Sequence, residues 1–260
     1  WWWADFRDPW TDIYYYRMFN PSYWARRQDA ALERSVLKGT ERVIAVSNDL
    51  KRLLSSKLIG ISQKITVIPN GYDPSDFNND VQVPKNVVRT LAYTGTLTLD
   101  YPLIELYTAL RNYCAVYGKI HLIFAGHPAH EALEEIKKLQ SEIPLSFDSK
   151  GYLPHHESVA ILQSADALLL LIPNYPNNRG HIPGKLFEYL GSGRPIWGFG
   201  PVDGDANAIL KQTQAGALYE DAQAAAEALA QWPEQGADLE ARTRYTRLGL
   251  ARELAAYFDK

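Results

Sequence analysis

Short apolar runs alternate with amphipathic stretches from about residue 90 onward, and this alternation permits few folds. The run at 167–172 is apolar at every position, which is typical of a parallel strand that helices cover on both faces. A repeated order of strand and helix predicts an α/β fold with a doubly wound, Rossmann-like parallel sheet. Ligands of such sheets bind at the carboxyl ends of the strands.

The spacing of apolar residues predicts the elements of this sheet. Strands are expected at 91–95, 120–126, 167–172, 196–199 and 217–219, and helices at about 102–117, 129–141, 155–164, 204–212, 221–231 and 238–258. The last helix is expected to carry an apolar stripe of Leu248, Ala251, Leu254, Ala255 and Phe258. Gly95, Gly126 and Pro173 fall at strand ends, where a ligand would bind.

The first eighty residues hold fewer predicted strands. Residues 42–47 and 65–68 are expected to be strands, Ser47 is expected to cap a helix at 48–57, and Pro69-Asn70-Gly71 predicts a turn. The stretch 74–86 has the composition of a linker, so we place a domain boundary near residue 82. So few strands make a poor independent domain, and the chain opens on Trp1 rather than Met. We therefore expect the N-terminal domain to be incomplete.

The composition is that of an ordinary globular protein and excludes several classes. A net charge of −3 offers no broad basic surface for nucleic acid. The single cysteine, Cys114, cannot form an internal disulfide, and its apolar neighbours predict a buried structural thiol. No apolar run reaches the roughly 18–20 residues that cross a bilayer, and no segment has the pattern of a signal peptide. We expect a cytoplasmic protein.

The segment 180–196 combines a loop broken by Gly and Pro, a short helix, a Gly stop and a new strand. Glycine lets the backbone approach a ligand closely, and the free N–H groups of a helix start suit an anion. Lys185 and Glu188 share one face of the helix, whereas Leu186 and Leu190 face the core. An ammonium beside a phosphate and a carboxylate beside sugar hydroxyls would bind a nucleotide-linked sugar. Ordinary helix capping and a solvated Lys–Glu pair are the alternative explanation.

Several segments occur in an order and at a spacing that resemble a known family. They are 41–47, 67–73, Gly95, the turn at 151–154 and the segment 184–195. Together they resemble the retaining nucleotide-sugar glycosyltransferases of the GT-B fold, the large family 4 group. The family implies two Rossmann-like domains that face each other across a cleft. By this resemblance, 1–82 form the C-terminal part of the acceptor-side domain with the linker, 83–235 form the donor-binding domain, and 236–260 form a helix that braces the N-terminal domain.

The resemblance implies donor-binding roles where the residues match. Glu188 corresponds to the carboxylate that accepts hydrogen bonds from the ribose hydroxyls. Gly184 and Lys185 lie where N–H groups and a cation meet the diphosphate. Gly95 and Thr96 correspond to the first loop of the donor domain. Tyr152 and Leu153 correspond to the contact with the base, and His181 and Ile182 correspond to the contact with the sugar.

Three departures from the family pattern bear on catalysis. The family's two glutamates, separated by seven residues, would place the first at position 180, where this chain has glycine. The usual Arg and Lys after the Gly95 loop are missing from 96–100, so the phosphate charge would rest on Lys185, the helix end and Arg179. The family's N-terminal catalytic histidine or aspartate is expected to lie outside this chain. The resemblance therefore assigns no catalytic residue in this chain.

The implied reaction transfers a sugar from a nucleoside diphosphate sugar to an acceptor hydroxyl with retention, as a hexosyltransferase in polysaccharide or glycoconjugate biosynthesis does. The helix end and Lys185 can stabilise the leaving diphosphate, so we expect neither a metal ion nor another cofactor. Asp203-Gly204-Asp205 has the spacing of a metal-binding triplet, but capping of the next helix by Asp203 or Asp205 is the stronger expectation. Residues 1–260 alone are expected to bind the donor without turnover.

Other functions fit the sequence less well. A non-catalytic nucleotide-sugar-binding module, or an inactive remnant, is the main alternative, because position 180 lacks the glutamate. A nucleotide-sugar epimerase has the same fold but needs several carboxylates and histidines in the cleft. No Gly-x-Gly-x-x-Gly follows the first strand, which disfavours a dinucleotide-dependent oxidoreductase. His155-His156-Glu157 predicts an exposed helix start rather than a metal site. His127 and His130 are expected to be loop and surface residues, and a place in the cleft is the alternative for His127.

An aromatic and basic segment spans 10–27. Its members are Trp10, Tyr14, Tyr15, Tyr16, Tyr23, Trp24, Arg26 and Arg27. Most such clusters pack within their own domain or at a domain interface. Contact with a lipid-linked acceptor or a membrane surface is the other explanation, and it would make the protein peripheral at the inner face of the membrane.

Overall fold

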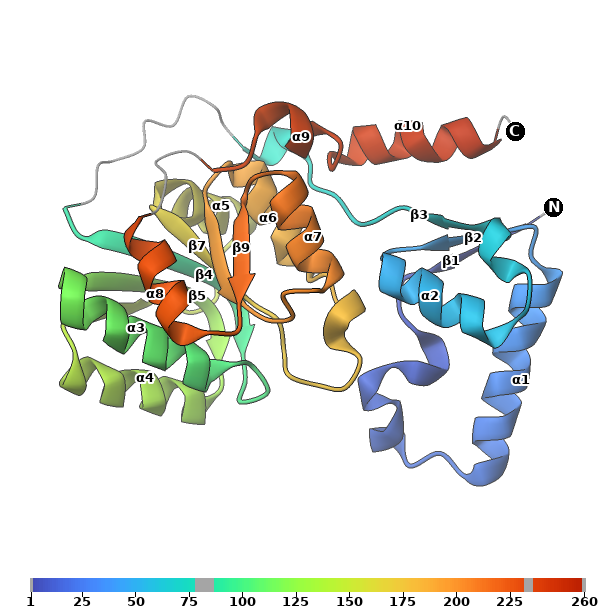
Figure 1. Ribbon diagram of the computed structural model, residues 1–260, viewed down its shortest axis with the longest axis horizontal. Helices are drawn as coiled ribbons and strands as arrows, with labels where there is room; N and C mark the ends of the chain where they lie inside the picture. The colour runs from blue at the N-terminus through green and yellow to red at the C-terminus, as the bar shows by residue number, and fades with distance from the viewer. Residues whose placement is uncertain (1, 78–86, 232–235, 259–260) are drawn as a thin grey trace.

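The computed structural model describes residues 2–77, 87–231 and 236–258. It contains two parallel sheets, each with helices packed against it (Figure 1). We call 2–77 the N-terminal unit and 87–231 the C-terminal unit. The predicted boundary near residue 82 and the predicted end of the donor domain at residue 235 lie outside the described residues.

The sheet of the C-terminal unit has six parallel strands in the order β6-β5-β4-β7-β8-β9. They are β4 (Arg89–Leu97), β5 (Ile120–Pro128), β6 (Leu145–Ser149), β7 (Ala167–Leu171), β8 (Ile196–Phe199) and β9 (Gly216–Tyr219). The chain order reverses between β4 and β7, which pair in parallel at the centre of the sheet. Doubly wound sheets bind ligands at this switch point. The predicted fold class is confirmed.

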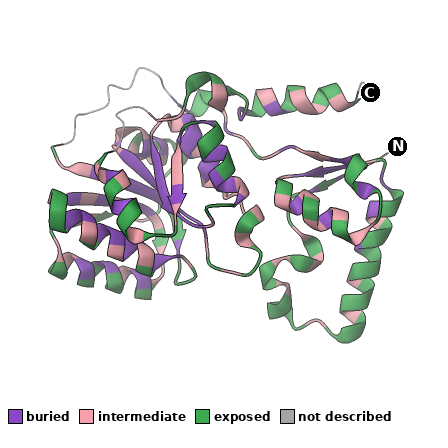
Figure 2. Ribbon diagram, in the orientation of Figure 1, coloured by how far each residue is buried: buried purple, intermediate pink, exposed green. Residues whose placement is uncertain are grey.

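Helices cover both faces of this sheet. One face packs against α3 (Leu103–Tyr117), α4 (His130–Glu142) and α8 (Ala222–Ala230), and the other against α5 (His155–Ser164), α6 (Gly184–Ser192) and α7 (Asp205–Gln212). Strand β7 is buried along its whole length, which explains its uninterrupted apolar run (Figure 2). Cys114 of α3 is a free, buried thiol, as predicted.

The N-terminal unit has a smaller parallel sheet in the order β1-β2-β3. Its elements are β1 (Trp3–Phe6), the 3-10 helices η1 (Trp10–Asp12) and η2 (Tyr14–Phe19), α1 (Tyr23–Gly39), β2 (Arg42–Ala45), α2 (Asn48–Lys57), η3 (Ile61–Lys64), β3 (Ile65–Val67) and η4 (Pro74–Asp76). Helix α2 begins as predicted, because the Ser47 hydroxyl accepts a hydrogen bond from the Leu50 N–H at 3.2 Å.

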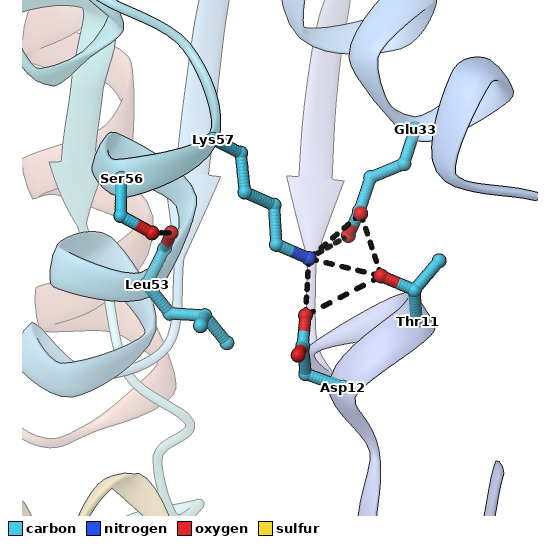
Figure 3. A network of polar contacts seen from close by, with 6 residues as sticks. All are labelled: Thr11, Asp12, Glu33, Leu53, Ser56 and Lys57. Carbon is cyan, nitrogen blue, oxygen red and sulfur yellow. Dashed lines mark hydrogen bonds and ion pairs between the residues drawn. The ribbon is translucent and has the colours of Figure 1, made fainter. Parts of the chain in front are cut away.

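A cluster of ion pairs and hydrogen bonds fastens η1 to α1 and α2 (Figure 3). The Lys57 ammonium donates to both carboxylate oxygens of Glu33 at 2.7 Å and lies 2.5 Å from a carboxylate oxygen of Asp12. The Thr11 hydroxyl donates to Glu33 at 2.8 Å. Because Glu33 is only 1% exposed, this carboxylate depends on these partners, and they hold η1 against the body of the unit.

The single helix predicted at 238–258 is wrong, because the chain forms α9 (Leu239–Thr243) and α10 (Arg247–Phe258) instead. Backbone contacts with Tyr72 replace helical bonds at the break. The Tyr72 N–H donates to the Tyr245 carbonyl at 3.1 Å, and the Arg247 N–H donates to the Tyr72 carbonyl at 2.8 Å. The predicted apolar stripe is also largely wrong, since four of its five members are exposed and Leu254 is half-buried: the exposed ones are Leu248, Ala251, Ala255 and Phe258.

Helix α10 lies against the N-terminal unit (Figure 1). Leu250 packs in a buried cluster with Ile44 and Ile68 of the smaller sheet. The ring of Phe258 stacks on Trp3, with the ring centroids 4.2 Å apart. The chain therefore returns from the C-terminal unit to the N-terminal unit along α10.

Candidate functional site

Helix α6 begins at the carboxyl edge of the large sheet, because it follows the loop that leaves β7. Pro183 precedes its first residue, Gly184, and no side chain caps its first turn. Its first N–H groups can therefore bind an anion. The apolar face is anchored in the core by Leu186, Phe187, Tyr189 and Leu190.

Lys185 lies in the first turn of α6, and its ammonium is buried without a hydrogen-bond partner among the described residues. Its Nζ lies 3.8 Å from the centroid of the Tyr93 ring. Burial lowers the pKa of Lys185 to about 7, against an opposing effect of nearby Glu188. A buried cation without an anionic partner is costly, so this site is prepared for an anion.

Gly95 lies in β4, opposite Gly126 of β5, directly beside this ammonium. Its φ of 112° favours glycine, and a Cβ there would come within 3.0 Å of Lys185 Nζ. A side chain at position 95 would therefore cover the cation. Thr96 follows in the same strand, and its carbonyl accepts a hydrogen bond from the Tyr93 hydroxyl at 2.6 Å. The structure thus brings Gly95, Thr96 and Lys185 together.

Glu188 lies one turn further along α6 and lines a hollow of about 480 Å³ with Gly184. The other charged, amide and imidazole side chains of its lining come from the N-terminal unit, α5 and α10: Arg7, Asn70, Asp73, Asp76, His155 and Arg247. Lys185 and His181 are not part of this lining. The start of α6 therefore presents Glu188 to the hollow and Lys185 to the end of β4.

Tyr152 and Leu153 follow the turn at Gly151, next to the carboxyl end of β5. The Gly126 N–H donates to the Gly151 carbonyl at 2.8 Å, which ties this turn to the strand. Tyr152 is 75% exposed, and its ring stacks on His127, with centroids 5.8 Å apart. An exposed aromatic pair at this edge can stack on a planar ring. Sequence spacing gives no sign of the His127–Tyr152 contact.

His181 is half-buried in the loop before α6. Its Nδ1 lies 2.6 Å from the Tyr175 hydroxyl, and the two rings meet edge to face. Burial lowers the pKa of His181, nearby Lys185 lowers it further, and Asp8 opposes this. The Tyr175 ring stacks on Tyr14 of the N-terminal unit at 4.1 Å. Neither tyrosine contact is predicted from the sequence.

The two aspartates around Gly204 differ from the prediction. Helix α7 has Gly204 as its N-cap and no side-chain cap, so the expected capping by Asp203 or Asp205 is wrong. Asp205 instead accepts hydrogen bonds from the Asp49 N–H at 2.8 Å and the Asn48 side chain at 3.0 Å. It therefore binds the start of α2 in the other unit.

Arg179, a candidate for the phosphate charge, pairs with Asp203 at 2.9 Å on the surface. His155 begins α5, as predicted, and lies 3.4 Å from a carboxylate oxygen of Asp76. Among the described residues, no three His, Cys, Asp or Glu side chains gather to hold a metal ion. Nor does any helix in 2–77, 87–231 or 236–258 have the length and apolar character to cross a membrane.

Comparisons with known proteins agree with this fold. Residues 6–76 match the model of glycosyltransferase family 4. HepE from Anabaena, solved with UDP and glucose, is similar with a TM-score of 0.70 at 15% identity, over 99% of this chain and 71% of HepE. Sucrose-phosphate synthase from Thermosynechococcus elongatus has a TM-score of 0.66 at 15% identity, over 99% of this chain and 67% of the synthase.

A glycosyltransferase from Rickettsia africae is similar with a TM-score of 0.63 at 16% identity, over 88% of this chain and 66% of that protein. No curated protein matches the sequence. At these identities the likeness concerns the fold. The chain has the GT-B fold of glycosyltransferases, as the sequence resemblance implied.

Proposed function

We propose that this protein is a glycosyltransferase that transfers a sugar from a UDP-linked donor to an acceptor hydroxyl with retention of configuration. The buried Lys185 ammonium carries this proposal, because it has no hydrogen-bond partner in the described chain and lies beside Gly95. A diphosphate at the first turn of α6 would pair with this cation and accept hydrogen bonds from the free N–H groups. As the sugar leaves, these groups would stabilise the negative charge that develops on the diphosphate without a metal ion.

Proteins of similar fold support a uridine nucleotide. HepE has been solved with UDP and with UDP-glucose, and these structures have TM-scores of 0.71 and 0.66 to this chain. In this proposal Glu188 accepts hydrogen bonds from the ribose hydroxyls, and the turn at Tyr152 and Leu153 contacts the base. Hydrogen bonds to a carboxylate are strong enough to make the ribose a main determinant of affinity.

Calorimetry tests the proposal directly. Wild-type protein is titrated with UDP, GDP, ADP and UDP-glucose, and UDP is expected to bind. Lys185→Met should weaken UDP binding by about 10-fold to 100-fold, because a charge-assisted contact is lost. Lys150→Met removes a surface lysine and is the matched control. Absence of UDP binding at millimolar concentration, or unchanged binding by Lys185→Met, would contradict the proposal.

A non-catalytic nucleotide-sugar-binding module is the second candidate, and Gly180 favours it because the family pattern has a glutamate there. For residues 1–260 alone we propose donor binding without turnover, since the donor-binding residues all lie in the C-terminal unit. Because no turnover is proposed for residues 1–260 alone, proton NMR of UDP-glucose distinguishes the two candidates when it is recorded with the parent protein and an acceptor. Sugar transfer with an α-anomeric product supports a retaining enzyme, whereas an intact donor after prolonged incubation supports the binding module.

The acceptor side is proposed to lie at a membrane, where a polysaccharide or glycoconjugate grows on a lipid-linked acceptor. The end of the N-terminal unit formed by η2 and the start of α1 exposes Met18, Phe19 and Trp24 at 73%, 71% and 76% (Figure 2). Arg17, Arg26 and Arg27 are exposed in the same segment. Apolar and aromatic side chains among arginines suit the anionic inner face of a membrane.

Vesicle sedimentation tests this contact. Wild-type protein should sediment with phosphatidylglycerol vesicles and not with phosphatidylcholine vesicles. Trp24→Ala should lose this binding, whereas Val116→Ala, at a residue of similar exposure (71%) in the other unit, should keep it. Equal sedimentation of both variants would exclude η2 and α1 as the contact.

A further inference from the structure

The loop between β7 and α6 crosses to the N-terminal unit through Gly180. A Cβ at this position would lie 2.8 Å from Asp49 Cβ and 3.1 Å from the Ser47 hydroxyl. Any side chain at 180 would therefore push the two units apart. A glutamate side chain has no room here, and His181 is the next polar residue of the loop.

His181 is the next residue, and its imidazole is held on two sides. The Tyr175 hydroxyl binds Nδ1 at 2.6 Å, which leaves Nε2 for a ligand. Behind Tyr175, the ring of Tyr14 stacks almost in parallel, at 4.1 Å and 16°. Tyr14 belongs to η2, directly after the turn that Thr11 and Asp12 fasten to Lys57 and Glu33 (Figure 3). Tyr14 of the N-terminal unit thus packs against Tyr175 of the loop between β7 and α6.

The protonation of Tyr175 and His181 defines what the His181 imidazole can offer to a ligand. Burial raises the pKa of the Tyr175 hydroxyl, so the hydroxyl keeps its proton. Burial lowers the pKa of His181, so its imidazole is neutral at neutral pH. The hydrogen bond with Tyr175 occupies Nδ1, and the neutral ring presents Nε2, which as an N–H or as a lone pair suits a sugar hydroxyl rather than a phosphate.

We propose that Tyr175 and Tyr14 are the positioning residues of His181, which the family resemblance places at the donor sugar. This inference rests on the proposed donor-binding function. It makes the sugar contact depend on a side chain of the N-terminal unit, whereas the residues proposed to bind UDP are themselves all in the C-terminal unit. The donor sugar is recognised fully only while Tyr14 remains stacked on Tyr175.

Calorimetry with four ligands separates this inference from the proposed function: UDP, UDP-glucose, UDP-galactose and UDP-N-acetylglucosamine. His181→Ala should bind UDP within twofold of wild type and bind at least one of the three UDP-sugars about fivefold to tenfold more weakly, the effect of one lost hydrogen bond. If His181→Ala binds all three like wild type, or loses UDP equally, the inference is overturned. If wild type binds no UDP, the proposed function fails first.

Two tyrosine variants test the positioning roles. Tyr14→Ala should weaken the same UDP-sugar as His181→Ala does, whereas Tyr14→Phe keeps the stacked ring and should behave like wild type. In Tyr175→Phe, imidazole ¹⁵N NMR should show a changed tautomer ratio for His181, because the hydrogen bond that fixes one tautomer is gone. An unchanged His181 signal in Tyr175→Phe, or equal effects of Tyr14→Ala and Tyr14→Phe, would overturn the assignment.

Discussion

The Lys185 ammonium lies 3.8 Å from the centroid of the Tyr93 ring and beside Gly95, the first exposed residue of β4 after its buried part. The electron-rich face of an aromatic ring attracts a cation but supplies no hydrogen-bond acceptor. The ring therefore keeps the ammonium in place and leaves its N–H groups for an anion. This arrangement is poor for stability and good for binding a diphosphate.

We expect UDP binding to take up a proton near pH 8. In the free protein, burial holds the pKa of Lys185 at about 7, so the amine is mostly neutral at pH 8. A bound diphosphate favours the ammonium and raises this pKa. Affinity should therefore fall as the pH rises above 7. Calorimetry at pH 8 in two buffers with different ionisation enthalpies measures the uptake, which should vanish in Lys185→Met. Equal heats for wild type in both buffers would contradict this expectation.

The same pKa also makes the stability of the unliganded protein depend on pH. An unfolded lysine titrates near 10.4, so between about pH 7 and pH 10 the unfolded chain holds more protons than the folded one. The contribution of Lys185 to the free energy of unfolding thus rises with pH in this window, by about 1.4 kcal/mol per unit. Urea unfolding of wild type and Lys185→Met at pH 7 and pH 9.5 checks this. The difference in the free energy of unfolding between wild type and Lys185→Met should be smaller at pH 9.5 than at pH 7.

Glu188 is expected to accept hydrogen bonds from the ribose hydroxyls of UDP. Wild type should prefer UDP to 2′,3′-dideoxy-UDP by about 10-fold or more, because hydroxyl hydrogen bonds to a carboxylate are lost. Glu188→Ala should bind both nucleotides equally, with an unchanged circular dichroism spectrum. Glu157→Ala, on the exposed start of α5, is the control. A preserved preference in Glu188→Ala would place the ribose elsewhere.

Much of the C-terminal unit follows from its apolar pattern. The helix predicted at 155–164 has the bounds of α5, and the run at 167–172 contains β7. Strand β6 escapes prediction because it lies at the sheet edge, where only Leu145 of its residues is buried. The break between α9 and α10 is not predicted from the sequence, for another reason. It depends on backbone bonds to Tyr72, and local propensity contains no sign of them.

The candidate site divides in the same way. Lys185 and Glu188 are predicted from the sequence because they are three residues apart, and a local helix places them on the same face. Asp205 is misjudged because its partners in α2 are about 156 residues away in sequence, so a local cap is the only role that its neighbours suggest. The stacking of Tyr14 on Tyr175 also joins distant segments. The contacts between the two units are therefore the part of the site that the sequence does not predict.

The buried carboxylate of Glu33 should make Lys57 important for stability. Lys57→Met leaves Glu33 buried without its cation, which should lower the free energy of unfolding by about 3–5 kcal/mol. The double variant Lys57→Met/Glu33→Met should recover much of this loss, because it leaves no buried charge. Lys137→Met, in an exposed pair with Glu134, should cost less than about 1 kcal/mol. Urea unfolding gives these values, and a double variant that is as unstable as Lys57→Met would contradict the explanation.

Asp205 should protect the first turn of α2 from solvent. Its carboxylate accepts the Asp49 N–H at 2.8 Å, and a negative charge is favourable at a helix start. Asp205→Ala removes this acceptor and should cost about 1–2 kcal/mol, as the loss of a helix cap does. Hydrogen exchange at the Asp49 amide is the sharpest measurement, and exchange should become faster in Asp205→Ala. Asp203→Ala breaks only the exposed pair with Arg179 and should leave this amide unchanged. If the Asp49 amide exchanges at the wild-type rate in Asp205→Ala, the two units do not share this contact in solution.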